Sequence, residues 1–174
     1  KTFRLNLSVT TPYNADFDGD EMQAHVPQDY GSVNEVQNLM GVNKMIMSSQ
    51  TSKPMMGIVQ DVLLSSYLMT QPGVKVKKQH FFDCIFSASK RGNVDYVKRW
   101  RQVLTRAKKY YKSDEIYNGK VLFSVLLPDN FYYTRKNNAN KDESEVVIKE
   151  GILISGVIDK QIIGRSHGCI IHRL

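Results

Sequence analysis

Residues 14–22 read Asn-Ala-Asp-Phe-Asp-Gly-Asp-Glu-Met and place three aspartates, Asp16, Asp18 and Asp20, two positions apart around Gly19. Carboxylates this close raise one another's pKa unless a cation joins them. Mg²⁺ prefers carboxylate and phosphate oxygens at about 2.1 Å. Because alternate residues of an extended strand lie about 7 Å apart, the chain has to curl around a shared ion, and Gly19 permits such a turn. The spacing therefore predicts a magnesium-binding loop.

Two other interpretations of this acidic stretch have to be weighed. An EF-hand loop that begins at Asp16 needs glycine at its sixth position and glutamate at its twelfth, but Glu21 and Pro27 stand there. The EF-hand is therefore excluded. A plain surface turn stays open as the alternative, because aspartate and glycine are both common in turns. We favour the metal-binding loop, since three carboxylates at this spacing would otherwise repel one another.

The composition limits the classes of protein to which the chain can belong. Its 174 residues suffice for one domain or parts of two. The formal charge of +7, from 24 basic and 17 acidic residues, is compatible with a nucleic-acid partner. Two cysteines, Cys84 and Cys169, indicate a reducing compartment without a disulfide framework. No apolar run reaches the length of a membrane span and no signal peptide is present, so we expect no membrane partner.

A short motif near the end of the chain offers a different set of metal ligands. His167, Cys169 and His172 form an H-x-C-x-x-H pattern with three ligands, whereas a structural zinc ion needs four. No second pair of cysteines or histidines lies nearby, so we predict no zinc site. The sequence also lacks a Walker loop, a G-x-S-x-G motif and an H-E-x-x-H motif.

A longer pattern surrounds the three aspartates. Residues 2–13 read Thr-Phe-Arg-Leu-Asn-Leu-Ser-Val-Thr-Thr-Pro-Tyr and lead directly into the Asn-Ala-Asp-Phe-Asp-Gly-Asp string. Together they resemble the active-centre segment of the largest subunit of multisubunit DNA-directed RNA polymerases, of the eukaryotic polymerase II type or a viral relative. The resemblance covers nearly the whole chain, with a divergent middle, and continues in residues 25–28, 52–61, 119–122, 127–128, 155–160 and 163–172.

The resemblance implies a specific role for each residue of the motif. Asp16, Asp18 and Asp20 match the family's ligands of a tightly held catalytic Mg²⁺, and a second Mg²⁺ is expected to arrive with the nucleoside triphosphate. Asn14 matches the residue that helps to read the ribose hydroxyls. The expected reaction is nucleotidyl transfer, in which the RNA 3′-hydroxyl attacks the α-phosphate and pyrophosphate leaves. The aspartates would serve as ligands and not as general bases.

The resemblance also implies partners and a location. The expected partners are the second-largest subunit, other polymerase subunits, the DNA template, the RNA transcript and nucleoside triphosphates. The protein is expected in the nucleus if it is cellular, and in the cytoplasm or the virion if it is viral. The family's subunit is far larger than this chain, so we interpret the chain as a piece of a larger subunit that is inactive by itself.

The expected fold class is α+β. Phe3, Leu5, Leu7 and Val9 alternate with polar residues, which predicts a half-buried strand. By the resemblance, residues 1–30 hold this active-centre strand and the metal loop, as the C-terminal part of a double-psi β-barrel. Residues 31–174 would form a mixed helix and strand pore domain, helical over residues 31–112 and β-rich over residues 119–174.

Patterning predicts the elements of the pore-like domain. Ser32 and Glu35 form a capping box for a first helix. Further helices are expected at residues 57–70, 78–89 and 93–111, and strands at residues 120–127, 131–133, 146–148, 152–158 and 161–163. A polar loop is expected over residues 136–145. Gln60 and Asp61 lie near the active centre by the resemblance, but a polar helix surface explains them equally well.

The helix expected at residues 93–111 is the most basic stretch of the chain. Its cationic residues are Lys98, Arg99, Arg101, Arg106, Lys108 and Lys109, followed by Lys112. A nucleic-acid contact is one interpretation. We prefer a solvated helix face or a contact with another subunit. The stretch also departs most from the polymerase II pattern, which suggests a divergent and plausibly viral member.

Two other functions remain as alternatives. An Asp-x-Asp nucleotide-sugar transferase would hold a metal and a diphosphate, but it needs a nucleotide-binding βαβ unit before the motif, and only fifteen residues precede Asp16. A non-catalytic subunit-interaction module with a vestigial acidic loop is the other alternative. Metal dependence distinguishes both from the polymerase interpretation.

Overall fold

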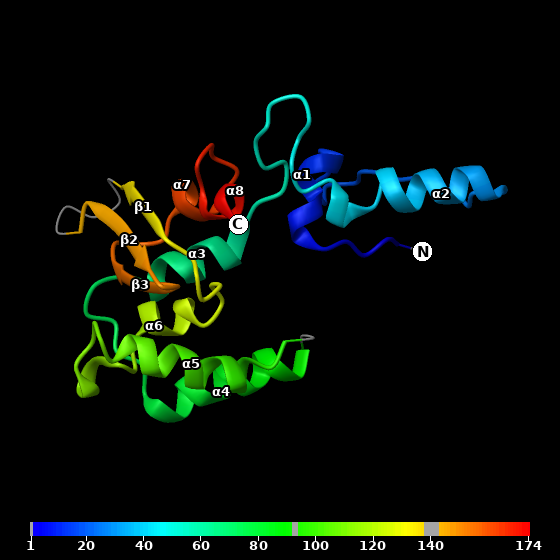
Figure 1. Ribbon diagram of the computed structural model, residues 1–174. Coiled ribbons are helices and arrows are strands. Elements are labelled where there is room, and N and C mark those ends of the chain that lie inside the picture. Colours follow the sequence, from blue (N-terminus) through cyan, green and yellow to red (C-terminus); the bar gives the residue numbers. More distant parts are fainter. Residues whose placement is uncertain (1, 92–93, 138–142) are drawn as a thin grey trace. The chain divides into compact units, whose positions relative to one another are not determined.

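The computed structural model describes residues 2–91, 94–137 and 143–174, and it contains both helices and a small antiparallel sheet (Figure 1). The predicted α+β class is confirmed. The chain forms two compact units. The first unit comprises Lys1–Leu63 and Lys160–Leu174, and the second comprises Leu64–Asp159. Within the described ranges, no helix combines the length and the apolar character needed to cross a bilayer.

The beginning of the first unit is not the strand that the alternating pattern predicted. Leu7–Val9 form a 3₁₀ helix, η1, and Thr10–Tyr13 form a short helix, α1. The side chain of Asn6 accepts a hydrogen bond from Ser8 N at 2.9 Å, and Thr10 Oγ1 donates to Leu7 O at 2.7 Å. Such local bonds compete with strand pairing. No strand lies among described residues 2–30, so the β-barrel stays a prediction.

Helix α2 (Tyr30–Leu39) confirms the first predicted helix but begins differently. Asp29 is its N-cap and accepts hydrogen bonds from Ser32 N at 2.8 Å and Ser32 Oγ at 2.6 Å. The predicted capping box at Ser32 is therefore wrong, because an acidic residue three positions earlier takes the capping role. Helix α2 buries none of its residues. A 3₁₀ helix, η2 (Val42–Lys44), follows it.

The rest of the first unit pairs a middle segment with the end of the chain. Ile58 N donates to Ile163 O at 3.2 Å. A Cβ on Gly57 would lie 3.0 Å from the backbone of Gly164, so the two segments approach closely. Helices α7 (Lys160–Ile163) and α8 (Ile170–Arg173) lie here. The strand predicted at residues 161–163 is wrong, because Gly164 N bonds to Lys160 O at 3.0 Å and closes a helical turn.

Helices and the sheet share the core of the second unit. Helices α4 (Lys78–Arg91) and α5 (Tyr96–Ala107) lie side by side (Figure 1). Phe81 and Trp100 pack with ring centroids 4.7 Å apart. The buried cluster consists of Phe81, Ile85, Trp100, Val103, Ala107, Ile116, Val121, Val125 and Ile152. The predicted helices at residues 57–70, 78–89 and 93–111 are confirmed in α3 (Gln60–Met69), α4 and α5, although Asn93 lies outside the described residues.

The sheet has three antiparallel strands in the order β1 (Tyr133–Lys136), β2 (Glu145–Lys149) and β3 (Ile152–Ser155). These strands confirm the predictions at residues 146–148 and at the start of residues 152–158. Strand β1 lies slightly beyond residues 131–133 and pairs with β2. Five residues of the predicted polar loop, 138–142, lie outside the described residues.

The strand predicted at residues 120–127 is wrong, because helix α6 (Gly119–Ser124) lies there. Asn118 is its N-cap and accepts from Val121 N at 2.7 Å. Five of the six helical residues are buried. A segment buried on nearly all sides shows neither the helical nor the strand period, so periodicity could not distinguish the two structures.

Buried or partly buried polar side chains fix the segment that follows β3. Glu143 Oε2 accepts from Gly156 N at 2.8 Å, Asn137 Nδ2 donates to Val157 O at 2.7 Å, and Thr70 Oγ1 accepts from Ile158 N at 2.9 Å. Three consecutive residues are thus each held by a side chain from a different segment. Satisfied buried hydrogen bonds of this kind specify one backbone path.

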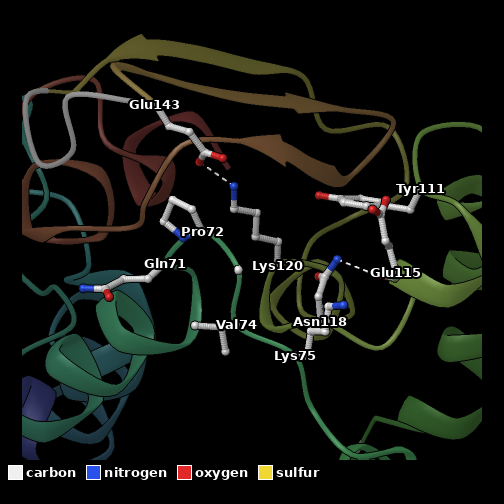
Figure 2. Close-up of a pocket in the computed structure, with 10 residues that line it drawn as sticks. Gln71, Pro72, Val74, Lys75, Tyr111, Glu115, Asn118, Lys120 and Glu143 are labelled. Atoms are coloured by element: carbon white, nitrogen blue, oxygen red, sulfur yellow. Dashed lines mark hydrogen bonds and ion pairs between the residues drawn. The ribbon is translucent and has the colours of Figure 1, made fainter.

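Lys120 and Glu143 form a largely buried ion pair beside a hollow of about 190 Å³ in the second unit. Figure 2 shows the Lys120 Nζ directed at the Glu143 carboxylate across this hollow. The Tyr111 hydroxyl, also in the lining, donates to Leu153 O at 2.5 Å. Burial raises the pKa of Tyr111 above its ordinary value. These polar groups bond to one another or to the backbone, which indicates a structural role.

Candidate metal centre

The loop with the three aspartates begins where helix α1 ends. Asn14 adopts the left-handed conformation, with φ 48° and ψ 39°, and its N–H donates to Thr11 O at 3.0 Å. Ala15 N then donates to Thr10 O at 2.9 Å. Asparagine is one of the few residues other than glycine that adopt this conformation readily. The helix end therefore reverses the chain and leads it into the loop.

Gly19 makes the second turn of the loop. Its φ of +128° lies in a region that other residues rarely adopt. No atom lies within 4 Å of the position that a Cβ would occupy at Gly19. The backbone conformation, and not a lack of space, therefore requires glycine between Asp18 and Asp20.

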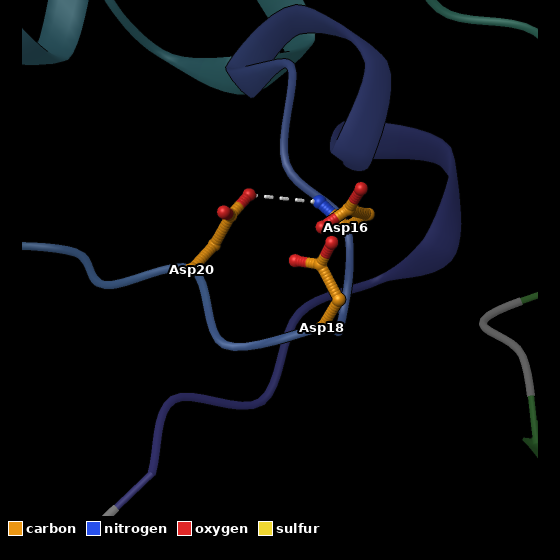
Figure 3. Close-up of side chains that lie close together, drawn as sticks. All are labelled: Asp16, Asp18 and Asp20. Carbon is orange, nitrogen blue, oxygen red and sulfur yellow. Dashed lines mark hydrogen bonds between the residues drawn. The ribbon is translucent and has the colours of Figure 1, made fainter.

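The two turns bring the carboxylates of Asp16, Asp18 and Asp20 together. One oxygen from each lies within 4.8 Å of the others. Figure 3 shows Asp16 and Asp18 on one side of the loop and Asp20 opposite them, with its carboxylate directed at the Asp16 backbone. Asp16 N donates to Asp20 Oδ2 at 3.0 Å. This bond ties the third aspartate to the first and closes the loop.

The electrostatics of the loop favour a cation. The hydrogen bond with Asp16, partial desolvation and the charge of Asp20 together raise the pKa of Asp18 above its ordinary value. All three side chains are exposed, and none forms an ion pair with the residues that the structure describes. Three carboxylates without a positive partner concentrate negative charge at one point.

The donor set fits a hard divalent ion such as Mg²⁺, because it consists of carboxylate oxygens alone. Two oxygens bound to one Mg²⁺ are at most about 4.2 Å apart, which is twice the metal–oxygen distance. The 4.8 Å limit observed here is slightly wider. Because all three side chains are exposed, a small rotation would close the fraction of an ångström that separates the two values. Among the described residues, this is the one group of three or more His, Cys, Asp or Glu side chains with such a geometry.

A hollow of about 420 Å³ lies beside the aspartates. Asp16 and Asp20 contribute to its wall, together with Phe3, Leu5 and Met22. The sequence patterning assigned Phe3 and Leu5 to a strand and did not single out Met22, so the wall was not identified. The alternation of Phe3 and Leu5 with polar residues is the sequence signal for an apolar side of this segment.

The other residues singled out in the sequence lie elsewhere. Asn14 is exposed at the helix end before the loop and outside the hollow. Gln60, with a φ of 55°, and Asp61 begin helix α3. The ring centroids of His167 and His172 are 4.7 Å apart, and His172 Nδ1 accepts from a backbone N–H at 3.0 Å. Of the predicted catalytic and substrate-binding residues, the structure brings the three aspartates together, whereas Asn14 lies before the loop.

Comparisons with known proteins show which family the chain resembles. The family model described as "RNA polymerase Rpb1, domain 2" matches residues 1–42, and "RNA polymerase Rpb1, domain 3" matches residues 45–174. A relative from Trypanosoma brucei brucei, the DNA-directed RNA polymerase II subunit RPB1-B, is 41% identical over 174 residues and 98% of this chain. The chain spans about 9% of the length of that relative. The two family models together match nearly every residue, so this chain belongs to the family of the largest subunit of DNA-directed RNA polymerases.

Proposed function

We propose that Asp16, Asp18 and Asp20 hold the catalytic Mg²⁺ of a DNA-directed RNA polymerase, which transfers nucleotides from nucleoside triphosphates to the RNA 3′ end on a DNA template. The observation that carries the proposal is the convergence of three exposed carboxylates on one closed loop. Membership of the largest-subunit family supports it, because the loop lies in the segment matched by the second domain of that family.

The residues of the loop would divide the work as follows. When bound, Mg²⁺ would lower the pKa of the attacking 3′-hydroxyl and would stabilise the negative charge that develops on the α-phosphate. The aspartates act as ligands, and the bond from Asp16 N to Asp20 holds the third ligand in place. We assign a second Mg²⁺ to the incoming triphosphate, so that the chain itself supplies one ligand set.

Asn14 is our candidate for contact with the ribose of the nucleotide. A side-chain amide both donates and accepts hydrogen bonds, as recognition of a hydroxyl requires. The left-handed conformation of Asn14 places it directly at the start of the loop. Asparagine thus combines a backbone preference with a recognition group at one position.

The proposed partners are the second-largest subunit and other polymerase subunits, together with the template, the transcript and the nucleotides. Helix α2 supports contacts with other polypeptide surfaces, because it exposes apolar side chains such as Val33, Val36 and Leu39. A nuclear location is proposed, since the relative compared is a eukaryotic polymerase II subunit. A viral origin, with a location in the cytoplasm or the virion, stays a prediction.

Neither alternative function is favoured. The nucleotide-sugar transferase finds no support in the comparisons, because both family models describe RNA polymerase. A purely structural interaction module does not explain why three carboxylates without a cationic partner converge.

Substitution of the ligands in the intact polymerase tests the proposal. Alanine at Asp16, Asp18 or Asp20 should reduce RNA synthesis by at least about 100-fold, while the subunits stay assembled. Glu35→Gln is a control, because Glu35 is an exposed acid on α2 that lies outside the loop. Binding of Mn²⁺, a spectroscopic substitute for Mg²⁺, should fall in the aspartate variants and not in the control.

The possible results separate the competing functions. Retained synthesis in all three variants would exclude a catalytic metal role for the loop. Loss of assembly, with subunits dispersed, would instead indicate a structural role. Loss of synthesis with unchanged Mn²⁺ binding would move the metal site to other residues.

A further inference from the structure

The structure separates the cations around α5 into two groups. Arg99 donates to Leu127 O at 2.7 Å, and Arg106 bonds to Asp129 Oδ1 at 2.6 Å and to Glu150 O at 2.9 Å. Lys109 pairs with Glu150 at 2.8 Å. These three side chains fasten α5 and the residues just after it to the segment before β1 and to the turn between β2 and β3. The positive charges of Arg99, Arg106 and Lys109 are therefore accounted for by contacts within the fold.

Lys98, Arg101 and Lys108 form the other group. Their side chains are exposed, and none makes a hydrogen bond or ion pair with the described residues through its charged end. At about 100° per residue, these three positions and Thr105 fall within an arc of about 80° on the helix. Trp100, Val103 and Ala107 occupy the opposite, buried side. We call Lys98, Arg101, Thr105 and Lys108 the basic stripe.

No acidic residue interrupts the basic stripe, since Tyr96–Ala107 contains neither aspartate nor glutamate. Asp95 lies next to it as the N-cap of α5, and its Oδ1 accepts from the backbone N–H groups of Val97 and Lys98 at 3.0 Å. The stripe is thus a row of three cations along about 15 Å of α5 and its C-cap Lys108. Thr105 lies among them, and its hydroxyl donates to Arg101 O at 3.2 Å. Lys90 and Arg91 in the last turn of α4 add further positive charge to the same unit.

The chemistry of the stripe suits a phosphate backbone better than a protein surface. Protein interfaces have an apolar and aromatic centre and are depleted in lysine, and the stripe has no apolar residue. Phosphate contacts in nucleic-acid complexes come from Arg, Lys and hydroxyl side chains. The stripe also lacks an aromatic residue on which an unpaired base would stack, so a duplex fits it better than a single strand.

We propose that the basic stripe of α5 binds the phosphate backbone of duplex DNA without reading its sequence. The choice of DNA as the partner rests on the proposed polymerase function, and the contact itself is independent of the metal loop. Each of Lys98, Arg101 and Lys108 neutralises about one phosphate. The contact therefore adds to the affinity of the polymerase for its DNA and increases the dependence of that affinity on salt.

The test measures DNA binding by the intact polymerase as a function of salt concentration, with a duplex DNA probe. The variant K98Q/R101Q/K108Q keeps long, helix-compatible side chains and removes three charges. The slope of log affinity against log salt should decrease in magnitude by about one for each substitution. The control is K136Q/K149Q, which removes two charges from exposed lysines on the strands of the same unit, so the change in slope is compared per charge removed.

Each result either supports or overturns the proposal. A smaller slope in the stripe variant alone supports it. An unchanged slope, or an equal change per charge in both variants, overturns it. If the stripe variant changes the slope with single-stranded RNA and not with duplex DNA, the choice of a duplex is overturned. If the stripe variant loses a subunit from the complex, the stripe makes a protein contact and the proposal is overturned. RNA synthesis on a preformed scaffold separates this proposal from the metal proposal, because the aspartate variants should lose synthesis and keep the salt slope.

Discussion

None of residues 2–53 is buried, whereas the second unit buries Phe81, Val121 and Ile152 completely. The aspartate loop takes its shape from local hydrogen bonds, such as Asp16 N to Asp20, and from the backbone conformations of Asn14 and Gly19. The second unit takes its shape from packed side chains. Local geometry can thus bring three carboxylates together without a buried core.

Removing a core ring should produce the largest effect. Phe81→Ala deletes a fully buried side chain that contacts Trp100 at a centroid distance of 4.7 Å. We expect the free energy of unfolding of the second unit to fall by about 3–5 kcal/mol, measured by denaturant titration with circular dichroism. Phe86→Ala is the matched control on the same helix, because Phe86 is 57% exposed. A similar loss in both variants would contradict the packing that we describe.

Two glycines sharpen the comparison between packed and open backbone. A Cβ on Gly156, with φ +92°, would lie 2.5 Å from Val146 Cα, whereas a Cβ on Gly19 meets no atom within 4 Å. Gly156→Ala should destabilise the second unit by roughly 2–4 kcal/mol, from backbone strain and overlap together. Gly19→Ala should leave that unit unchanged and weaken Mn²⁺ binding by about tenfold, since strain alone acts there. Equal effects on unfolding would refute the distinction.

The buried phenol of Tyr111 predicts a loss of stability at alkaline pH. Burial, followed by the charges of Glu143 and Glu115, raises its pKa above the ordinary value of 10.0. The folded state therefore keeps the proton at a pH where the unfolded chain releases it, so this stability is complete below about pH 10 and decreases as the pH rises further. Tyr111→Phe should remove that part of the pH dependence and, by loss of the bond to Leu153 O, about 1 kcal/mol at neutral pH. Exposed Tyr132→Phe should do neither.

The smallest effect is expected at the cap of helix α2. Hydrogen bonds from the Ser32 side chain and then its backbone lower the pKa of Asp29. The cap is therefore present above the ordinary pKa of an aspartate and is lost as the pH falls through the lowered value. Asp29→Ala should speed amide hydrogen exchange in the first turn of α2 at neutral pH and leave the second unit unchanged. An equal loss of protection in the unchanged protein at low pH, relative to the intrinsic exchange rate at that pH, would confirm the role of the charge.

Some parts of the structure could be predicted from the sequence and others could not. Helix α4 was predictable because Phe81 and Ile85 recur on one face. The convergence of Asp16, Asp18 and Asp20 was predictable from their spacing around Gly19, whereas their binding of a metal stays a prediction. The segment of Phe3 and Leu5 was not, because its alternating pattern fits a strand while Asn6 forms a local turn. Helix α6 was missed because burial on nearly all sides hides its period. Phe3 and Leu5 also line the hollow beside the aspartates, so the sequence did not predict the wall of that hollow.

Trp100 has a spectroscopic consequence. It is the single tryptophan of the chain, is 5% exposed and lies in the aromatic cluster of the second unit. Fluorescence excited selectively at the tryptophan of this chain therefore reports on the packing of the helical core in the second unit, without an engineered label there.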